Sequence, residues 1–317
     1  MTVLVVLIVA VLLDALLGET KRFHPLVGFG SIAKKVEQKL NTQTQSRPQQ
    51  RLLGVVAWAS LVLPLPIIYQ LFLPKGGWWL IVDIVVVYVA IGLTSLAQHA
   101  KAVYMPLKNN EIEQARLKCS YLVSRDTSEL NSTKLSRATT ESVLENGHDA
   151  FVATLFWFVI GGAPLVIAHR LVNTLDAMWG YKTPRFINFG WCSARMDDVM
   201  GWPSAKVTSV LYALQAPLPK IMKCLTNAYS QSKTYKSLNG GWVMASGSTA
   251  LNLKLGGQSQ YFGEATESPI LGQGNTVEPA DILASVKLVN RAGFLFILFV
   301  GLLFALYQIV LFQGVPL

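Results

Sequence analysis

The chain has little charge and little cysteine, and it lacks the short motifs that mark common nucleotide and metal sites. Only 14% of its residues are charged, whereas an average soluble domain has about 25%. Its cysteines, Cys119, Cys192 and Cys224, show no zinc-ligand or disulfide spacing. The sequence contains no G-x-x-x-x-G-K-[ST], H-E-x-x-H, C-x-x-C or G-x-S-x-G. These absences exclude a P-loop, a zincin site and the nucleophile elbow of hydrolases.

Apolar residues dominate instead, at 52% of the chain, and the mean hydropathy is +0.41. A helix needs about 20 apolar residues to cross the hydrocarbon core of a bilayer. Five segments meet or approach that length, at residues 3–17, 52–73, 78–96, 151–168 and 294–313. We therefore expect an all-α polytopic integral membrane protein with one membrane domain over residues 1–317. Asp14 interrupts the first segment and no basic region precedes it, so we interpret it as an uncleaved span.

Basic residues predict the topology. Of the 27 Lys and Arg residues, all but Lys75 and Arg170 lie in segments 18–51, 99–150 and 171–293. The positive-inside rule places these three loops in the cytoplasm. The net charge of +9 therefore indicates orientation in a membrane, and no basic-aromatic motif points to nucleic acid.

The segment 151–168 is broken by Gly161-Gly162-Ala163-Pro164. If the loops on both sides of it are cytoplasmic, it does not cross the membrane once. Either it forms a re-entrant hairpin at these glycines, which we favour, or a segment near 203–225 returns. Broken helices at membrane depth occur where they are buried in protein or line a cavity.

The most informative polar feature is a helical stripe just before this broken segment. A helix is expected over 132–147, with Ser132 as its N-cap. Residues at i, i+4, i+8 and i+12 share one helix face, and here they are Arg137, Glu141, Glu145 and Asp149, with Asn146 beside them. Carboxylates on one face hold Mg²⁺ in many proteins; the alternative is a salt-bridge ladder on a solvated surface. Three acids to one arginine beside a membrane favour a site.

A second polar group follows the broken segment. It consists of Asn173, Asp176, Arg195, Asp197 and Asp198. An adjacent pair of aspartates near an arginine suits a metal–phosphate group and stabilises developing charge. The alternative is a pair of acids placed at a helix N-terminus by the helix dipole.

Other features allow two interpretations each. Asp14 near the end of the first span is either functional or at the membrane interface, and His24 is either a base or a structural histidine. Arg125 and Asp126 precede a helix, where they suit an anion or an ordinary cap. The pairs Gly240-Gly241 and Gly256-Gly257 either let the backbone approach a large ligand or form turns.

Taken together, these segments resemble the adenosylcobinamide-phosphate synthase family of cobalamin biosynthesis, the CobD/CbiB family. The resemblance covers most of the chain and rests on six motifs in order: DALLGE…HPLVGFG (14–30), SRDTSEL (124–130), ESVLENGHDAF (141–151), LVNTLDAMWGYK (171–182), FGWCSARMDD (189–198) and NGGWVMA…LGGQSQYFG (239–263). Three residues depart from the family's pattern: Thr20 in place of a proline, Lys206 in place of an arginine, and His148 in place of a small or polar residue.

The resemblance implies an acid–amine ligase. The expected reaction joins aminopropanol, or its phosphate, to the free propionate of adenosylcobyric acid, giving adenosylcobinamide or its phosphate. ATP would activate the carboxylate as an acyl phosphate, because an oxide is a poor leaving group, and Mg²⁺ would hold the phosphates.

The resemblance also suggests roles for the candidate residues. Expected Mg²⁺ ligands are Glu141, Glu145, Asp197 and Asp198, and expected phosphate contacts are Arg125, Arg137 and Arg195. Asp14, His24 and Asp149 are candidates for accepting the amine proton or orienting the corrinoid. Asp126 is a further candidate catalytic residue. Ligand-binding candidates are Asn146, Asn173, Asp176, Gly240, Gly241, Gly256 and Gly257.

Two other functions remain as alternatives. One is a non-catalytic membrane sensor or regulatory protein of the AmpE-like type, and the other is a small-molecule transporter. We expect the bacterial inner membrane as the location, a cytoplasmic active site, and a homo-oligomer or a complex with other late cobalamin-assembly membrane enzymes. Partners are the corrinoid, aminopropanol phosphate and membrane lipid, with no nucleic acid.

Overall fold

The protein is almost entirely helical, and it divides into two compact units. A computed structural model describes residues 2–19, 24–42, 44–72, 77–261 and 264–312. One unit comprises Met1–Gly92 with Thr154–Gly201, and the other comprises Leu93–Ala153 with Trp202–Leu317. Thr20 and most of the loop between the second and third predicted spans lie outside the described residues.

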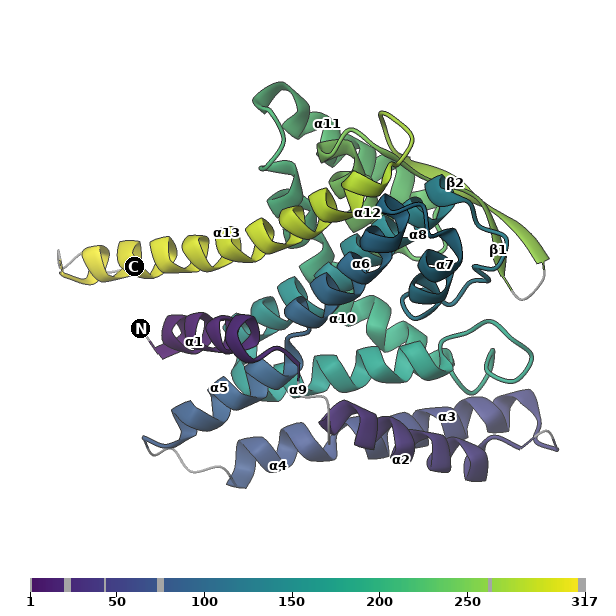
Figure 1. The fold of residues 1–317 in the computed structure, drawn as a ribbon. Coiled ribbons are helices and arrows are strands. Elements are labelled where there is room, and N and C mark those ends of the chain that lie inside the picture. Colours follow the sequence, from purple (N-terminus) through teal and green to yellow (C-terminus); the bar gives the residue numbers. More distant parts are fainter. Residues whose placement is uncertain (1, 20–23, 43, 73–76, 262–263, 313–317) are drawn as a thin grey trace. The chain divides into compact units, whose positions relative to one another are not determined.

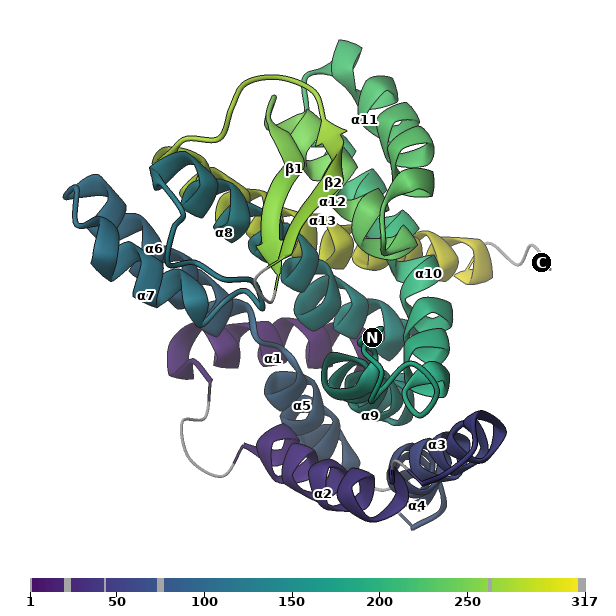
Figure 2. The same ribbon diagram turned by 90° about the vertical axis from the view of Figure 1, so that its right-hand side faces the viewer.

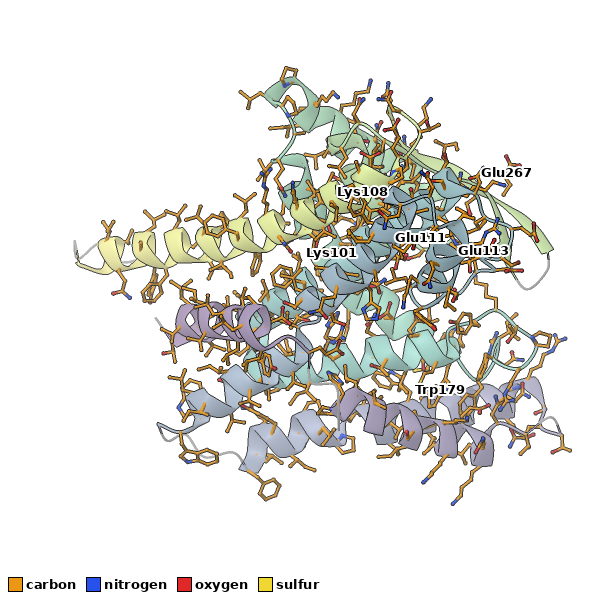
Figure 3. The ribbon with its side chains drawn as sticks, viewed as in Figure 1. Lys101, Lys108, Glu111, Glu113, Trp179 and Glu267 are labelled. Atoms are coloured by element: carbon orange, nitrogen blue, oxygen red, sulfur yellow. The ribbon has the colours of Figure 1, made fainter. Side chains whose placement is uncertain are left out.

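The first unit is helical and contains an aromatic core. The helices are α1 (Thr2–Leu17), α2 (Pro25–Leu40), α3 (Arg47–Val62), α4 (Pro64–Phe72), α5 (Trp79–Ala90), nearly all of α9 (Ala153–Trp179) and the start of α10 (Trp191–Ala213). α2 and α3 lie side by side (Figures 1 and 2). Trp179, labelled in Figure 3, meets Phe189 edge to face with ring centroids 5.1 Å apart. A Cβ at Gly54 would lie 2.0 Å from the Phe189 carbonyl oxygen, so glycine permits α3 to approach this core.

The second unit contains the polar stripe. Its elements are α6 (Leu93–Lys108), α7 (Ile112–Ser120), α8 (Ser132–Asn146), the π-helical turn η1 (Gly147–Val152), the end of α10, α11 (Leu218–Gln231), the 3₁₀ turn η2 (Ser232–Thr234), α12 (Leu238–Ala250), β1 (Lys254–Tyr261), β2 (Glu264–Gly272) and α13 (Pro279–Phe312). α8 packs against α6, α12 and α13. Figure 3 shows Lys101 and Lys108 along α6 and Glu113 on α7. The carboxylates of α8 therefore lie within a packed unit.

A two-stranded hairpin accompanies the helices. β1 and β2 pair antiparallel, and the register shifts between Leu255 and Gly257. Figures 1 and 2 show the hairpin beside α12. The expectation of an all-α membrane protein is confirmed for the helices, and this small hairpin is an addition that the glycine-rich sequence did not predict.

The predicted membrane segments lie in helices. Among the described residues, four helical stretches are long and apolar enough to span a bilayer: Arg47–Phe72, Trp79–Lys108, Ser132–Trp179 and Pro279–Val310. Thr2–Leu17 is a shorter apolar helix. Along α13, Phe294 is 67% exposed and Leu302 is 61% exposed. Such a row of exposed apolar side chains is unfavourable in water and suits the hydrocarbon of a membrane.

The predicted break in the fourth segment is present in α9. Gly161 has φ −152° and ψ 24°, and Gly162 has φ 67° and ψ −162°, so both leave helical geometry. The positive φ of Gly162 favours glycine, and Pro164 lacks the N–H that an uninterrupted helix would use. The break is confirmed, and its re-entrant course through a membrane stays a prediction.

The helix that carries the stripe begins as expected, with one correction. Asn131, not Ser132, is the N-cap of α8, and its side chain accepts from the backbone N–H of Lys134 at 2.9 Å. Asn and Ser are comparable N-cap residues, so the sequence alone does not show which of these two neighbours is the N-cap.

Candidate functional site

The stripe of α8 faces glycine backbone at three successive points. A Cβ added to Gly257 would lie 3.1 Å from Arg137 Nη1, and one added to Gly240 would lie 2.5 Å from Glu145 Oε1. Between them, the backbone N–H of Gly256 donates to Glu141 Oε1 at 2.8 Å. The structure thus joins two features that are far apart in the sequence, because glycine lets the main chain approach the charged groups closely.

Glu141 is held on both carboxylate oxygens. Arg125 Nη2 donates to Glu141 Oε2 at 2.6 Å, and the two side chains are 10% and 7% exposed. The Gly256 N–H occupies the other oxygen. A buried, charge-assisted pair of this kind fixes the geometry of both partners. Its clearest role is therefore to hold Arg125 in place, and metal ligation by Glu141 stays a prediction.

Glu145 is the carboxylate at the centre of the charged group. It lies half-buried against Gly240, and the charges of Asp149, Lys236, Glu141 and Arg125 all act on it. Within the described residues, no group of three or more His, Cys, Asp or Glu side chains is arranged to hold a metal ion. Mg²⁺ commonly takes only one or two carboxylates and completes its shell with water and substrate phosphate. Glu145 is a candidate for a ligand of this kind, and its metal role stays a prediction.

The glycines of the site have different backbone requirements. Gly240 and Gly241 lie in the first turn of α12, where the Ser237 hydroxyl accepts from the Gly240 N–H at 3.1 Å. Gly256 and Gly257 lie in β1 with φ of 80° and 81°. Gly240 and Gly241 are therefore not in a turn between elements, and the positive φ of the second pair accompanies the bulge in β1.

Asp149 is held by a residue that the sequence did not single out as functional. His148 Nδ1 lies 2.8 Å from Asp149 Oδ1, and His148 Nε2 lies 2.9 Å from the Ser204 hydroxyl. Burial raises the pKa of the Tyr212 phenol, and the charge of Asp149 raises it further. The one signal in the sequence was the departure of His148 from the family pattern.

Lys206 is a second residue outside the predicted set. Its Nζ lies 4.1 Å from the ring centroid of Trp242 and 5.0 Å from that of Trp202. No residue in the described part of the chain accepts a hydrogen bond from this buried Nζ. Burial lowers the pKa of Lys206 to about 8. The cation–π contacts offset part of the cost of burying the ammonium group.

Two candidates of the first unit, Asn173 and Asp197, contact each other. Asn173 Nδ2 donates to Asp197 Oδ1 at 3.3 Å, and Arg170 Nη1 donates to Asn173 Oδ1 at 3.5 Å. Arg195 and Asp198 are exposed on α10. Asp176 lies near the end of α9, where a Cβ at Gly180 would be 2.0 Å from its Oδ1. The metal and phosphate roles of this group stay predictions.

The remaining candidates lie at or near helix ends, except Asp126, which lies in the loop between α7 and α8. His24 is the N-cap of α2 and its Nδ1 accepts from the Leu26 N–H at 3.2 Å, which favours the structural interpretation. Asp126 accepts from the Ser128 N–H at 2.9 Å, and this bond lowers the pKa of its carboxyl. Asn146 donates back to the Ser142 carbonyl at 2.9 Å. Asp14 is buried on α1.

Fold and site together define a class: a helical membrane protein that holds a row of carboxylates and arginines against glycine backbone. The chain belongs to the CobD/CbiB family, because the family model described as "CobD/Cbib protein" matches residues 7–289. It is 44% identical over 291 residues to the "Cobalamin biosynthesis protein CobD" of Stutzerimonas stutzeri, covering 91% of this chain and 94% of that one. The protein of the same name from Chromobacterium violaceum is 43% identical over 90% of this chain and 92% of its own.

A more distant relative covers almost the whole length. The "Cobalamin biosynthesis protein CobD" of Halalkalibacterium halodurans is 35% identical over 95% of this chain and 98% of its own. No solved structure matches the chain significantly. The resemblance inferred from the six motifs is thereby confirmed at the level of the family.

Proposed function

We propose that the protein is an enzyme of cobalamin biosynthesis that forms an amide between a corrinoid carboxylate and aminopropanol or its phosphate. The observation that carries the proposal is the row of charged side chains on α8 that meets the backbone of Gly240, Gly256 and Gly257. Open backbone beside paired charges suits a large anionic ligand. The names of the relatives, which are cobalamin biosynthesis proteins, supply the pathway.

The chemistry requires an activated carboxylate. In the proposed reaction ATP phosphorylates the free propionate of adenosylcobyric acid, and the amine then displaces phosphate from the acyl phosphate. Glu145 would hold Mg²⁺ together with ATP, and the ion would supply neutralisation of the phosphate charge. Arg137 lies beside Gly257 and Arg125 is fixed by Glu141, and we propose that both bind phosphate oxygens.

We further propose that the site faces the cytoplasm of a bacterial inner membrane. The basic residues in segments 18–51, 99–150 and 171–293 support this orientation, and ATP is a cytoplasmic substrate. For Asp197, Asp198 and Arg195 of the first unit, we propose that the two aspartates bind a metal ion and that the arginine binds phosphate.

Mass spectrometry of the corrinoid tests the proposal. Purified protein in lipid nanodiscs is incubated with adenosylcobyric acid, Mg²⁺, ATP and either aminopropanol phosphate or aminopropanol. A mass gain equal to one amine minus one water, dependent on ATP, is the expected result. An unchanged corrinoid that stays bound would favour a sensor, and transport of an unchanged corrinoid into proteoliposomes would favour a transporter.

A further inference from the structure

Three side chains of the second unit form a hydrogen-bonded chain that ends at the site. Ser204 Oγ lies 2.9 Å from His148 Nε2, and His148 Nδ1 lies 2.8 Å from Asp149 Oδ1. Ser204 belongs to α10, whereas His148 and Asp149 are neighbours in η1. The chain of contacts thus links two segments that are more than fifty residues apart in the sequence.

His148 and Asp149, which contact each other, both lie in a π-helical turn. The six residues Gly147–Val152 form a π-helix, a rare and strained element that often marks functional positions. Gly147 seats this turn against α13, because a Cβ there would lie 2.5 Å from Val289 Cγ2.

The exposure of the three side chains differs between the two ends of this hydrogen-bonded chain. The order of contacts is that of a Ser–His–Asp triad, but Ser204 is fully buried in the middle of α10. The side chain of His148 is only 2% exposed, whereas that of Asp149 is 28% exposed. A nucleophile has to reach its substrate, so Ser204 does not serve as one. The carboxylate is the accessible end.

The contacts also assign the protons. An ionised carboxylate only accepts hydrogen bonds, so Nδ1 of His148 carries the proton and donates to Asp149. The other ring nitrogen of a neutral histidine is then an acceptor, and Ser204 donates to it. Ser204 therefore fixes the tautomer, and the tautomer fixes the carboxylate. This is how the outer partner of a histidine commonly orients it.

We propose that His148 and Ser204 are positioning residues that hold Asp149 as the acceptor of the amine proton, an inference that rests on the proposed function. The amine nitrogen attacks the carbonyl carbon of the acyl phosphate, and a C–N bond forms. The C–O bond to phosphate breaks, phosphate leaves with the bonding electrons, and the nitrogen's proton passes to Asp149. The charges of Asp149 and Lys236 act on Glu145, and the charge of Asp149 acts on Tyr212.

Two substitutions at one position separate the two contacts of the ring. His148→Asn places an amide N–H near the Nδ1 position, and His148→Gln places its amide near the Nε2 position. Ser209→Ala is the matched control, because Ser209 is also fully buried on α10 and donates only within its helix, to Ala205 at 2.7 Å. Thermal unfolding in detergent checks that each variant folds.

The expected result is a loss in kcat at unchanged KM. A general base contributes about 10²- to 10⁴-fold, so we expect His148→Gln to lower kcat at least tenfold and His148→Asn to retain several times more activity than His148→Gln. Ser209→Ala should turn over like the wild type. Equal rates for both His148 variants and the wild type would overturn the proposal. Losses of activity that merely parallel a loss of thermal stability would overturn it too.

A spectroscopic readout separates this proposal from the reaction itself. Nitrogen NMR of labelled histidine reports the tautomer, and the chain has only 4 histidines, so His148→Asn identifies the signal. We expect the Nδ1-protonated form in the wild type and a change in Asp149→Asn. The Nε2-protonated form in the wild type would overturn the positioning role even if amide forms. A wild type with the expected tautomer but no amide product would overturn the proton-acceptor role together with the proposed function.

Discussion

Gly240→Ala tests whether the approach of α12 to Glu145 matters for activity and not for folding. The added Cβ would lie 2.5 Å from Glu145 Oε1, which is 0.9 Å inside the 3.4 Å at which ordinary contact begins. Oε1 is the far end of a flexible side chain, and the φ of Gly240 is not in the positive range, so the carboxylate moves and the helix stays. Alanine is also a better helix residue than glycine by up to about 1 kcal/mol.

We expect stability to be kept and activity to fall. A displacement near 1 Å of a catalytic group costs on the order of 10²-fold in rate, so kcat/KM in the amide assay should fall about 10- to 100-fold while the unfolding temperature is unchanged or higher. Gly28→Ala in α2 is the control, because nothing lies within 4 Å of the added Cβ. In a Glu145→Ala background, Gly240→Ala should add little further loss, since both changes act on one carboxylate. Full activity of Gly240→Ala, or the same loss in both backgrounds, would refute the reasoning.

Three further predictions concern stability and the second acidic group. Arg125→Ala leaves the buried Glu141 without its countercharge, so we expect about 3–5 kcal/mol of destabilisation and a lower unfolding temperature in detergent. The effect should be smaller in Arg125→Ala/Glu141→Gln. Equal unfolding temperatures for Arg125→Ala and the wild type would contradict this prediction. Burial lowers the pKa of Lys206 from 10.5 to about 8. Between these two pH values the lysine is protonated in the unfolded chain and neutral in the folded chain. The free energy of unfolding should therefore rise as the pH rises from about 8 to 10.5. Lys206→Met should lose this rise, and Lys223→Met, at an exposed lysine, should keep it. If the pH profiles of unfolding are the same for both variants, burial does not lower the pKa of Lys206. Asp197→Asn and Asp198→Asn should abolish amide formation and leave membrane insertion intact, whereas near-normal turnover would remove the metal role.

Local periodicity allowed the stripe on α8 to be predicted. Arg137, Glu141 and Glu145 recur every four residues within α8, and a helix places such residues on one face whatever surrounds it; Asp149 follows in η1. The break at Gly161 and Gly162 is equally local, because paired glycines before a proline interrupt a helix. These features need no knowledge of distant contacts.

Contacts between distant residues were not predictable in the same way. Glu141 meets Gly256 across 115 positions, and nothing in either segment specifies the other. The same holds for His148 and Ser204. The hairpin of β1 and β2 was missed because its Gly- and Ser-rich strands lack the alternating apolar pattern of half-buried strands.

The fate of the carboxylate oxygen tests the central claim most directly. Adenosylcobyric acid labelled with ¹⁸O at both oxygens of its free propionate is incubated with the protein, ATP, Mg²⁺ and aminopropanol phosphate. The ¹⁸O content of the amide and of the released phosphate is then measured by mass spectrometry. We predict that one ¹⁸O stays in the amide and one appears in the released inorganic phosphate, in proportion to product. Amide formation without label in the phosphate, or without ATP, would contradict activation through an acyl phosphate.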